Sequence, residues 1–194
     1  LENGVDYEFY VARDDGSAKS ETRLVQATPP IDGATVVNYI HPDDQYYNFA
    51  GWWIGSPYIV KLPSGKLIAA HDVFGEENNV EILFSSEDNG KTWQYLTEMA
   101  NFWTSKLFVN NGKLYILGSG NSTWGIGIAE SSDEGKTWTE PVTLIRKMHN
   151  KSQIYKGYGN IVNNTPIVSH NGRLYTVFET GGWSRWSDDA YDCH

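Results

Sequence analysis

The chain has 194 residues, of which 40% are hydrophobic and 14% aromatic, with 19 glycines, a composition typical of a folded, loop-rich protein. Its net charge of -9 and its lack of a basic stripe argue against nucleic acid as a partner. No apolar run approaches the roughly 18 residues of a membrane span, and the single cysteine, Cys193, excludes an internal disulfide, so we expect no membrane span, metal or cofactor.

The first residues, 1–50, are expected to form an N-terminal extension or preceding strands. The chain begins with neither a methionine nor a signal peptide, and its last residues, GGWSRWSDDAYDCH, show no closing turn pattern. We therefore interpret the chain as an internal piece of a longer reading frame. The alternative is a short natural protein with frayed termini.

A first repeat unit is predicted over 51–100. Apolar runs rich in β-branched and aromatic residues occupy 58–62, 66–74 and 80–85, each bounded by Gly, Asn, Asp or Pro. This composition and these boundaries are typical of β-strands. The unit continues into the polar turn SSEDNGKTW at 85–93.

The next unit, predicted over 101–145, repeats this order. Strands are expected at 113–119 and 125–131, and the turn SSDEGKTW follows, with Trp138 lying 45 residues after Trp93. The recurrence of a strand, a polar turn and a tryptophan at one spacing indicates an internal repeat.

The last unit, 146–194, is expected to be incomplete. Gly65, Gly112 and Gly172 sit in the similar phrases PSGKL, NNGKL and HNGRL, and should occupy equivalent hairpin turns. The spacing is longer between the second and third glycine, and we assign the surplus to a loop over 147–160.

The repeat length predicts the fold class. A period of roughly 40 to 50 residues with about four short strands per repeat is what one propeller blade needs. We therefore predict an all-β chain, 1–194, that is part of one β-propeller domain of four-stranded antiparallel blades. The chain would cover about two and a half to four blades, and a solenoid is the alternative.

Both polar turns match the pattern S-x-D-x-G-x-x-W, which is the Asp-box. Over roughly residues 50–180 the chain thus resembles the sialidase-like, Asp-box β-propeller superfamily. Ser and Asp accept hydrogen bonds from nearby amides, Gly supplies an unusual backbone conformation, and Trp can bury its indole beneath the hairpin or between blades. The resemblance implies that these turns lie away from the sugar site. The residues with this structural role are Ser86, Asp88, Gly90, Trp93, Ser131, Asp133, Gly135 and Trp138.

A polar or aromatic cluster precedes the innermost expected strand of each unit. Propeller sites lie at one end of the central channel, where equivalent positions of successive blades meet. Aromatic faces and amide or hydroxyl groups suit carbohydrate, although the tryptophans can instead fill the inner ends of the blades. The predicted substrate-binding residues are Trp53, Ser56, Asn101, Trp103, Ser105, Asn160, Asn163 and Asn164.

The predicted catalytic residues are His71 and Asp72, a polar pair that interrupts an apolar strand. A histidine pKa suits proton transfer near neutrality, with Asp72 orienting His71 or binding the sugar. The alternative is that His71 is a satisfied core or strand-end residue. Clustering of these residues on one concave surface, away from both Asp-boxes, is expected.

The resemblance implies a secreted or periplasmic carbohydrate-active enzyme that cleaves a glycosidic bond in a glycan or polysaccharide. It departs from sialidases at one point, because their Arg-Ile-Pro phrase is replaced by IGSPYIV at 54–60. We therefore do not expect a sialidase activity. We expect instead a related glycoside hydrolase or polysaccharide lyase. The alternatives are a non-catalytic propeller that binds a glycan or protein, and a scaffold within a longer enzyme.

Overall fold

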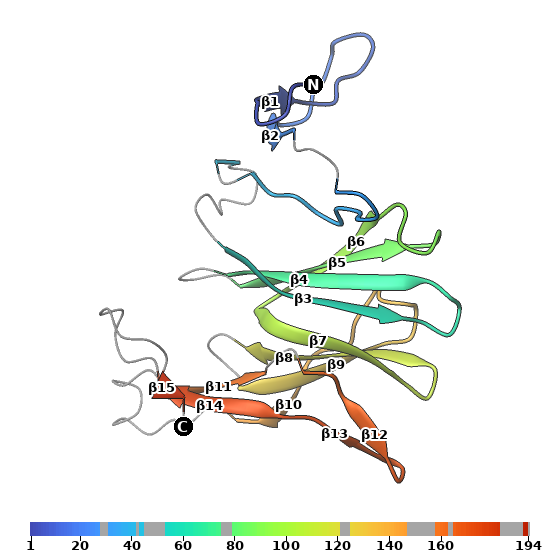
Figure 1. The fold of residues 1–194 in the computed structure, drawn as a ribbon, viewed down its shortest axis with the longest axis vertical. Coiled ribbons are helices and arrows are strands. Elements are labelled where there is room, and N and C mark those ends of the chain that lie inside the picture. Colours follow the sequence, from blue (N-terminus) through green and yellow to red (C-terminus); the bar gives the residue numbers. More distant parts are fainter. Residues whose placement is uncertain are drawn as a thin grey trace. The chain divides into compact units, whose positions relative to one another are not determined.

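The computed structural model describes residues 1–27, 31–41, 43–44, 53–74, 79–120, 125–146, 158–162, 165–182 and 192–193 (Figure 1). The chain divides into two compact units, Leu1–Trp53 and Ile54–His194. Every regular element in the described ranges is a β-strand, which confirms the all-β prediction.

The first unit contains a two-stranded hairpin of β1 (Asp6–Phe9) and β2 (Arg23–Gln26). Two polar side-chain contacts tie this hairpin to the segment that follows it within the same unit. Asp6 lies 3.2 Å from Nε2 of His41, and Nε of Arg23 lies 2.7 Å from Asp44.

The second unit begins with a four-stranded sheet, in which the strands neighbour one another in chain order. Its strands are β3 (Trp53–Lys61), β4 (Leu67–Phe74), β5 (Val80–Ser86) and β6 (Gln94–Ala100). The β4–β5 and β5–β6 pairs are antiparallel. Such a meander is the arrangement of one propeller blade.

A second four-stranded antiparallel sheet follows with the same topology. It consists of β7 (Phe102–Asn110), β8 (Lys113–Gly120), β9 (Ile126–Ser131) and β10 (Val142–Ile145). Its first strand, β7, packs against β4 of the preceding sheet. Successive sheets therefore meet through the first strand of one and the second strand of the other.

The remaining strands form two smaller sheets. The first has the order β11–β14–β15, and the second is the hairpin of β12 and β13. Strand β11 packs against β8 of the second sheet, just as β7 packs against β4 of the first sheet. The bounds are β11 (Tyr158–Val162), β12 (Val168–His170), β13 (Arg173–Tyr175), β14 (Phe178–Gly182) and β15 (Asp192–Cys193).

The three repeated glycines occupy hairpin turns, as the sequence predicts. Gly112 and Gly172 each close a two-residue loop after an asparagine, and all four residues have positive φ, between 48° and 77°. Asn-Gly loops of this kind match the twist of the flanking strands. Gly65, with φ 94°, lies in the longer β3–β4 turn.

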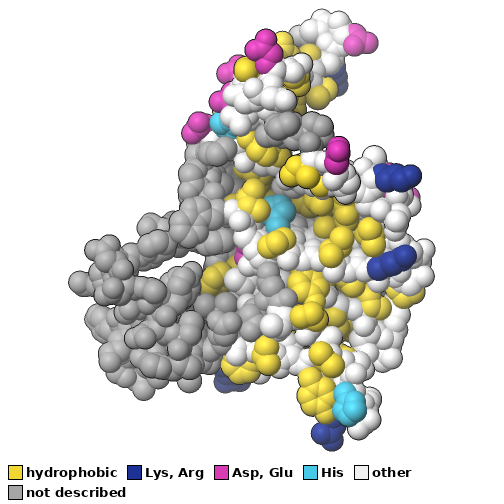
Figure 2. Space-filling view, in the orientation of Figure 1, with side chains coloured by type: hydrophobic (Ala, Val, Ile, Leu, Met, Phe, Trp, Pro, Cys, Tyr) yellow, Lys and Arg dark blue, Asp and Glu magenta, His cyan; other side chains and the backbone are white. Residues whose placement is uncertain are grey.

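The core lies between the two four-stranded sheets. It is built from inward-facing residues of both, namely Leu62, Ile68, Ala70, Leu83, Met99, Phe102, Leu107, Leu114, Ile116 and Ala129. Figure 2 shows hydrophobic side chains on the surface of this unit. Ile59 of β3 and Tyr95 of β6 are among its exposed hydrophobic residues.

Each SxDxGxxW turn is closed by the same hydrogen bonds. In the first turn, the Ser86 hydroxyl donates to Asp88 Oδ1 at 2.8 Å and accepts from the Gly90 amide at 2.9 Å. Asp88 also accepts from the amide and the hydroxyl of Thr92, at 2.9 and 2.7 Å. These bonds, led by that of the Thr92 hydroxyl, lower the pKa of Asp88 to about 2.

The second turn repeats this network with Ser131, Asp133, Gly135 and Thr137, at distances between 2.6 and 2.9 Å. The pKa of Asp133 is likewise lowered to about 2, with the Thr137 hydroxyl as the largest cause. The threonine is a member of the turn that the sequence pattern did not include, although Lys-Thr-Trp occurs in both copies.

The tryptophans Trp93 and Trp138 are equivalent but half-buried, whereas buried positions were expected. Each indole N–H donates to the carbonyl oxygen of the turn glycine, Gly90 or Gly135, at 3.1 Å. This bond keeps one edge of the ring against its own turn, so the ring remains partly in contact with solvent.

One surface cation joins the two turns. Lys66, which follows the β3–β4 turn, lies 3.2 Å from Glu87 of the first turn and 2.8 Å from Glu134 of the second. Glu134 and Glu87, in that order, raise the pKa of Lys66. The ammonium group therefore stays charged and connects two neighbouring sheets at the turn end.

Replacing Ser131 with Ala should lower the free energy of unfolding by about 1 to 2 kcal/mol, because the buried Gly135 amide loses its acceptor. Urea unfolding measures this change. Ser169→Ala, at an exposed position of β12, is the control and should unfold like the wild type. Equal effects of the two substitutions would contradict the proposed role of the turn.

Candidate functional site

The inner strands β3 and β7 both begin with a distorted backbone. Ser56 and Thr104 have φ of 48° and 45°, a conformation that a β-branched residue such as threonine rarely adopts. In β7 the register with β8 shifts between Trp103 and Lys106, which marks a β-bulge. A distortion of this kind redirects the Thr104 amide out of the sheet, and strained backbone often accompanies functional sites.

The redirected Thr104 amide donates to Oδ2 of Asp72, on β4 of the neighbouring sheet, at 2.6 Å. The next pair of sheets repeats this contact, because Ser119 Oγ of β8 accepts from the Val162 amide of β11 at 2.9 Å. The Thr104 hydroxyl lies 3.0 Å from the same Ser119 oxygen. We call these two contacts, Asp72 with Thr104 and Ser119 with Val162, the seam hydrogen bonds.

Asp72 and Ser119 occupy equivalent places in their strands. Each lies five residues after the first apolar residue of β4 or β8, Leu67 or Leu114. One carboxylate oxygen of the predicted catalytic Asp72 thus has a structural role that a serine performs in the next sheet.

Lys106 makes a third contact between successive sheets. Its side chain is fully buried, and Nζ donates to the Thr165 carbonyl at 2.9 Å and to the Thr176 hydroxyl at 3.0 Å. Burial lowers the pKa of Lys106. Both acceptors are neutral oxygens, and their dipoles help to stabilise the buried ammonium group.

His71 and Asp72 point to opposite faces of their sheet, since successive side chains of a strand alternate. Asp72 shares its face with Ile68 and Ala70 of the core between the sheets. His71 is 7% exposed and stacks on Phe84, with the ring centroids 5.7 Å apart. Its Nδ1 lies 3.3 Å from the main-chain oxygen of Asp72, so this contact uses the backbone rather than the carboxylate.

Burial is the largest influence on both groups. It lowers the pKa of His71, and the backbone and charge of Asp72 oppose this in part. It raises the pKa of Asp72, against the opposing effects of the Thr104 amide, the Ser56 hydroxyl and His71. The neutral imidazole, which can accept a proton, is therefore favoured at neutral pH.

Glu81 is an acidic residue of this region that the sequence reading missed. It pairs directly opposite Asp72 in the β4–β5 register and is 0% exposed. Burial, and then the charge of Asp72, raise the pKa of Glu81 well above its usual value. The signal was present in VEILF, where one carboxylate interrupts an apolar run.

Several buried polar atoms here have no hydrogen-bond partner in the described part of the chain. They are Asp72 Oδ1, both carboxylate oxygens of Glu81, Trp103 Nε1 and Ser105 Oγ. Ser105 lies close enough to lower the pKa of Glu81 in part without reaching hydrogen-bond geometry. The Ser105 side chain fits here because residue 118 of β8 is glycine. A Cβ atom on Gly118 would lie only 2.6 Å from the Ser105 hydroxyl oxygen.

The structure places the other predicted binding residues on several strands. Ser56 is half-buried in β3, and Asn101 lies in the β6–β7 turn, where its amide donates to the Asn79 carbonyl at 2.8 Å. Asn160 pairs with Thr180 in β11, but its side chain, like that of Trp53, lies outside the described residues. Asn163 and Asn164 lie outside them entirely.

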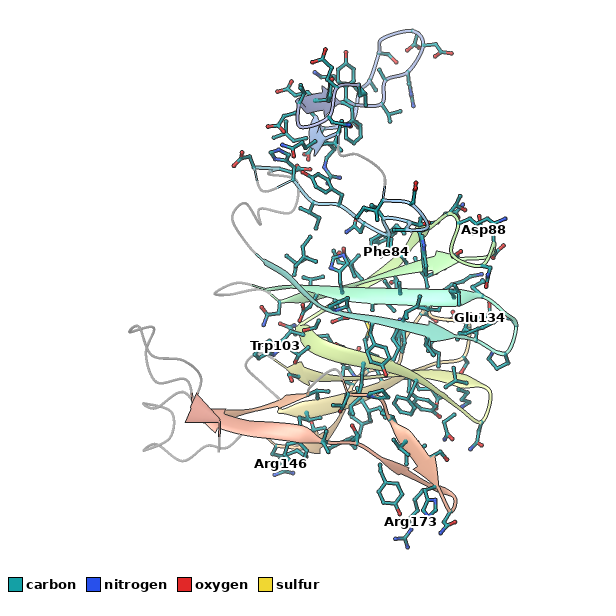
Figure 3. All side chains as sticks on the ribbon, in the orientation of Figure 1. Phe84, Asp88, Trp103, Glu134, Arg146 and Arg173 are labelled. Carbon is teal, nitrogen blue, oxygen red and sulfur yellow. The ribbon has the colours of Figure 1, made fainter. Side chains whose placement is uncertain are left out.

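Trp103 lies at the opposite end of the strands from the two polar turns. Figure 3 shows it on the left of the second unit, whereas Asp88 and Glu134 of the turns lie on the right. Trp103 therefore lies away from the polar turns (Figure 3). Whether all candidates share one concave surface stays a prediction.

The described residues contain no helix long and apolar enough to cross a membrane. They also bring together no group of three or more His, Cys, Asp or Glu side chains that could hold a metal ion.

Comparison with solved structures identifies the fold. The arabinofuranosidase of Fusarium graminearum, solved with arabinobiose as a GH93 enzyme, matches 66% of the chain with a TM-score of 0.50 and 17% identity. The chain has a sialidase-like β-propeller fold. An α-L-arabinanase of Penicillium chrysogenum matches 66% of the chain at 20% identity and TM-score 0.48, and Trypanosoma rangeli sialidase matches 91% at 16% identity and TM-score 0.47.

The match to these propellers is partial. The chain spans 40% of the length of the Fusarium enzyme, 41% of the Penicillium enzyme and 27% of the Trypanosoma sialidase. No protein-family model matches the chain, and no curated protein does. At these identities the comparison establishes the propeller fold and no activity.

Replacing Ser119 with Ala should lower the free energy of unfolding by about 1 to 3 kcal/mol, because the buried Val162 amide loses its acceptor. Hydrogen exchange of the Val162 amide should become faster at the same time. Ser169→Ala is again the matched control. Unchanged exchange at Val162 would contradict the seam hydrogen bond.

In an NMR titration, the His71 ring should protonate below pH ~6.5, the value of an unperturbed histidine, because burial disfavours the charged ring. The folded pKa is lower than the unfolded one, so this group stabilises the protein above the unfolded pKa. That contribution is lost as the pH falls below ~6.5. A midpoint at or above 6.5 would show that His71 is not buried as described.

Proposed function

We propose that the chain is part of a carbohydrate-active propeller that cleaves a glycosidic bond in a glycan or polysaccharide. The observation that carries the proposal is the buried Trp103 Nε1 atom, which has no hydrogen-bond partner in the described part of the chain and lies at the end of the strands opposite the polar turns (Figure 3). Such atoms cost free energy unless a ligand or water meets them, and they therefore mark functional sites. The binding of arabinobiose by the Fusarium propeller supports a sugar as the ligand.

The proposed site is the end of the second unit where β4 ends and β7 and β11 begin. Trp53 and Trp103 would offer flat apolar faces to the sugar ring. Hydroxyl and amide groups would bind its oxygens, from Ser56, Asn101, Ser105, Asn160, Asn163 and Asn164.

His71 is the proposed acid–base residue. Its favoured neutral form takes a proton in one step and returns it in another, as general acid–base catalysis requires. Asp72 contributes by position, because its bond to the Thr104 amide holds the start of β7 and with it Trp103. The arrangement supports hydrolysis and elimination alike, so both a hydrolase and a lyase fit.

The proposed substrate is not a sialic acid. Arginine binds the carboxylate of such a sugar through two parallel hydrogen bonds, a geometry that other residues do not reproduce. Strand β3 instead carries Gly55, Ser56 and Pro57 at the place of the sialidase Arg-Ile-Pro phrase. A secreted or periplasmic location accords with a glycan substrate and is part of the proposal.

A non-catalytic propeller that binds a glycan or protein through the same end is the second candidate. The observation that favours it is the complete burial of Asp72, one of whose oxygens is already used between the sheets. Binding through Trp103 and Ser105 would need no ionisable group.

A panel of arabinan, pectic and host glycans separates the two candidates. His71→Ala should reduce turnover at least 100-fold, since acid–base groups contribute about 10²–10⁴-fold, while calorimetry shows sugar binding retained. His170→Ala, on the exposed β12–β13 hairpin, is the control and should react like the wild type.

The outcomes divide clearly. Wild-type protein that binds a glycan but cleaves none of the panel supports the binding propeller and removes His71 from catalysis. Turnover that survives His71→Ala also removes it. Protein that neither binds nor cleaves any glycan overturns the proposal.

A further inference from the structure

Asp72 and Glu81 form a buried acidic pair between two blades. They are direct partners in the antiparallel β4–β5 register, which places their side chains on one face of the sheet as close neighbours. Both are 0% exposed. The same face carries the core that packs against the second sheet, so these carboxyl groups lie at the edge of an apolar interior.

The hydrogen bonds of the pair are incomplete if both groups are ionised. Ionised carboxylates only accept, so neither can donate to the other. The Thr104 amide supplies Asp72 Oδ2, but Asp72 Oδ1, both oxygens of Glu81 and the nearby Ser105 Oγ have no partner in the described ranges. Two adjacent buried negative charges with so few donors would strongly destabilise the fold.

We propose that Asp72 and Glu81 form one buried site that holds a single proton. A proton on Glu81 converts one of its oxygens into a donor, which can be directed to Asp72 Oδ1. The Ser105 hydroxyl can then donate to the other oxygen of Glu81. One proton thus completes the hydrogen bonding of four buried oxygens and leaves Asp72 Oδ2 ionised for its bond to the Thr104 amide.

The charged groups of the surrounding strands do not replace this proton. On β4, His71 lies on the opposite face of the sheet. On β6, Met99 stands opposite Glu81, while Glu98 pairs with Ile82 and so faces the other side. On β7, Lys106 directs its ammonium to Thr165 and Thr176. The pKa of Glu81, raised well above its usual value by burial and by Asp72, agrees with the assignment.

The site makes the stability of the protein depend on pH. The folded pKa of Glu81 lies above the unfolded value of ~4.3, so folding takes up a proton between these two values. Stability from this group is present below pH ~4.3 and is lost as the pH rises through the folded pKa. For one proton, the unfolding equilibrium constant rises by up to about tenfold per pH unit in this window.

The test is unfolding by urea across a range of pH with Glu81→Gln, whose amide imitates a protonated carboxyl. The variant should lose the pH dependence assigned to the site and should be more stable than the wild type near pH 8. Difference infrared spectroscopy should show a protonated carboxyl band in the wild type at neutral pH, and this band should be absent in Glu81→Gln. Glu98→Gln, on the exposed side of β6, should change neither measurement.

A second variant guards against misfolding. Asp72→Asn keeps an oxygen for the Thr104 amide and also removes one member of the pair, so it should weaken the same pH dependence. The proposal fails if the infrared band is absent from the wild type, or if the pH dependence survives in both variants. Stabilisation of the wild type by Ca²⁺, lost in Glu81→Gln, would instead assign a cation site and would also overturn it. The measurements use no sugar, so they do not depend on the proposed function.

Discussion

The seam hydrogen bonds are the constraint on which the second unit depends. A propeller must pass from one blade to the next without leaving amides of the new inner strand buried and unpaired, because an unpaired buried amide is costly. The chain solves this with an acceptor near the end of the second strand of each blade, Asp72 in one and Ser119 in the next. The candidate residues His71, Asp72, Trp103 and Ser105 stand on β4 and β7, the two strands that the first of these bonds joins.

The use of a carboxylate at one seam and a hydroxyl at the other has electrostatic consequences. Ser119 brings no charge into the interior, whereas Asp72 does, and Glu81 stands beside it. A purely structural acceptor could have been serine in both places. A buried aspartate at this position therefore lowers the free energy of unfolding more than a serine would. This additional cost indicates that the first seam has a role beyond packing.

Local features of the fold could be predicted from the sequence, because the residues that produce them are close together. The Asn-Gly hairpins and the two SxDxGxxW turns depend on positive φ and on hydrogen bonds that span at most four residues. The burial of the turn tryptophans was overestimated, because the bond from each indole to its own turn was not foreseen. Thr92 and Thr137 were visible in the sequence and were overlooked.

The candidate site was harder to predict, because it depends on contacts between distant residues. The bond between Asp72 and Thr104 spans 32 residues, and no local pattern announces it. Glu81 was read as part of an apolar strand, since its significance arises only from its cross-strand neighbour. His71 and Asp72 looked like a cooperating pair, but strand alternation sends their side chains to opposite faces.

The turn and seam hydrogen bonds differ in the sequence separation of the residues they join, and this difference affects the order in which the chain folds. The turn bonds join residues four or fewer positions apart, whereas the seam bonds join residues 32 and 43 positions apart. Closing a short loop is faster and loses less chain entropy than closing a long one. Each meander can therefore form as a unit before it docks on its neighbour, and the same docking contacts recur from one blade to the next. A lineage could add or lose a whole blade by duplication or deletion of one such segment, because the new seam requires no contact that the existing seams do not already use.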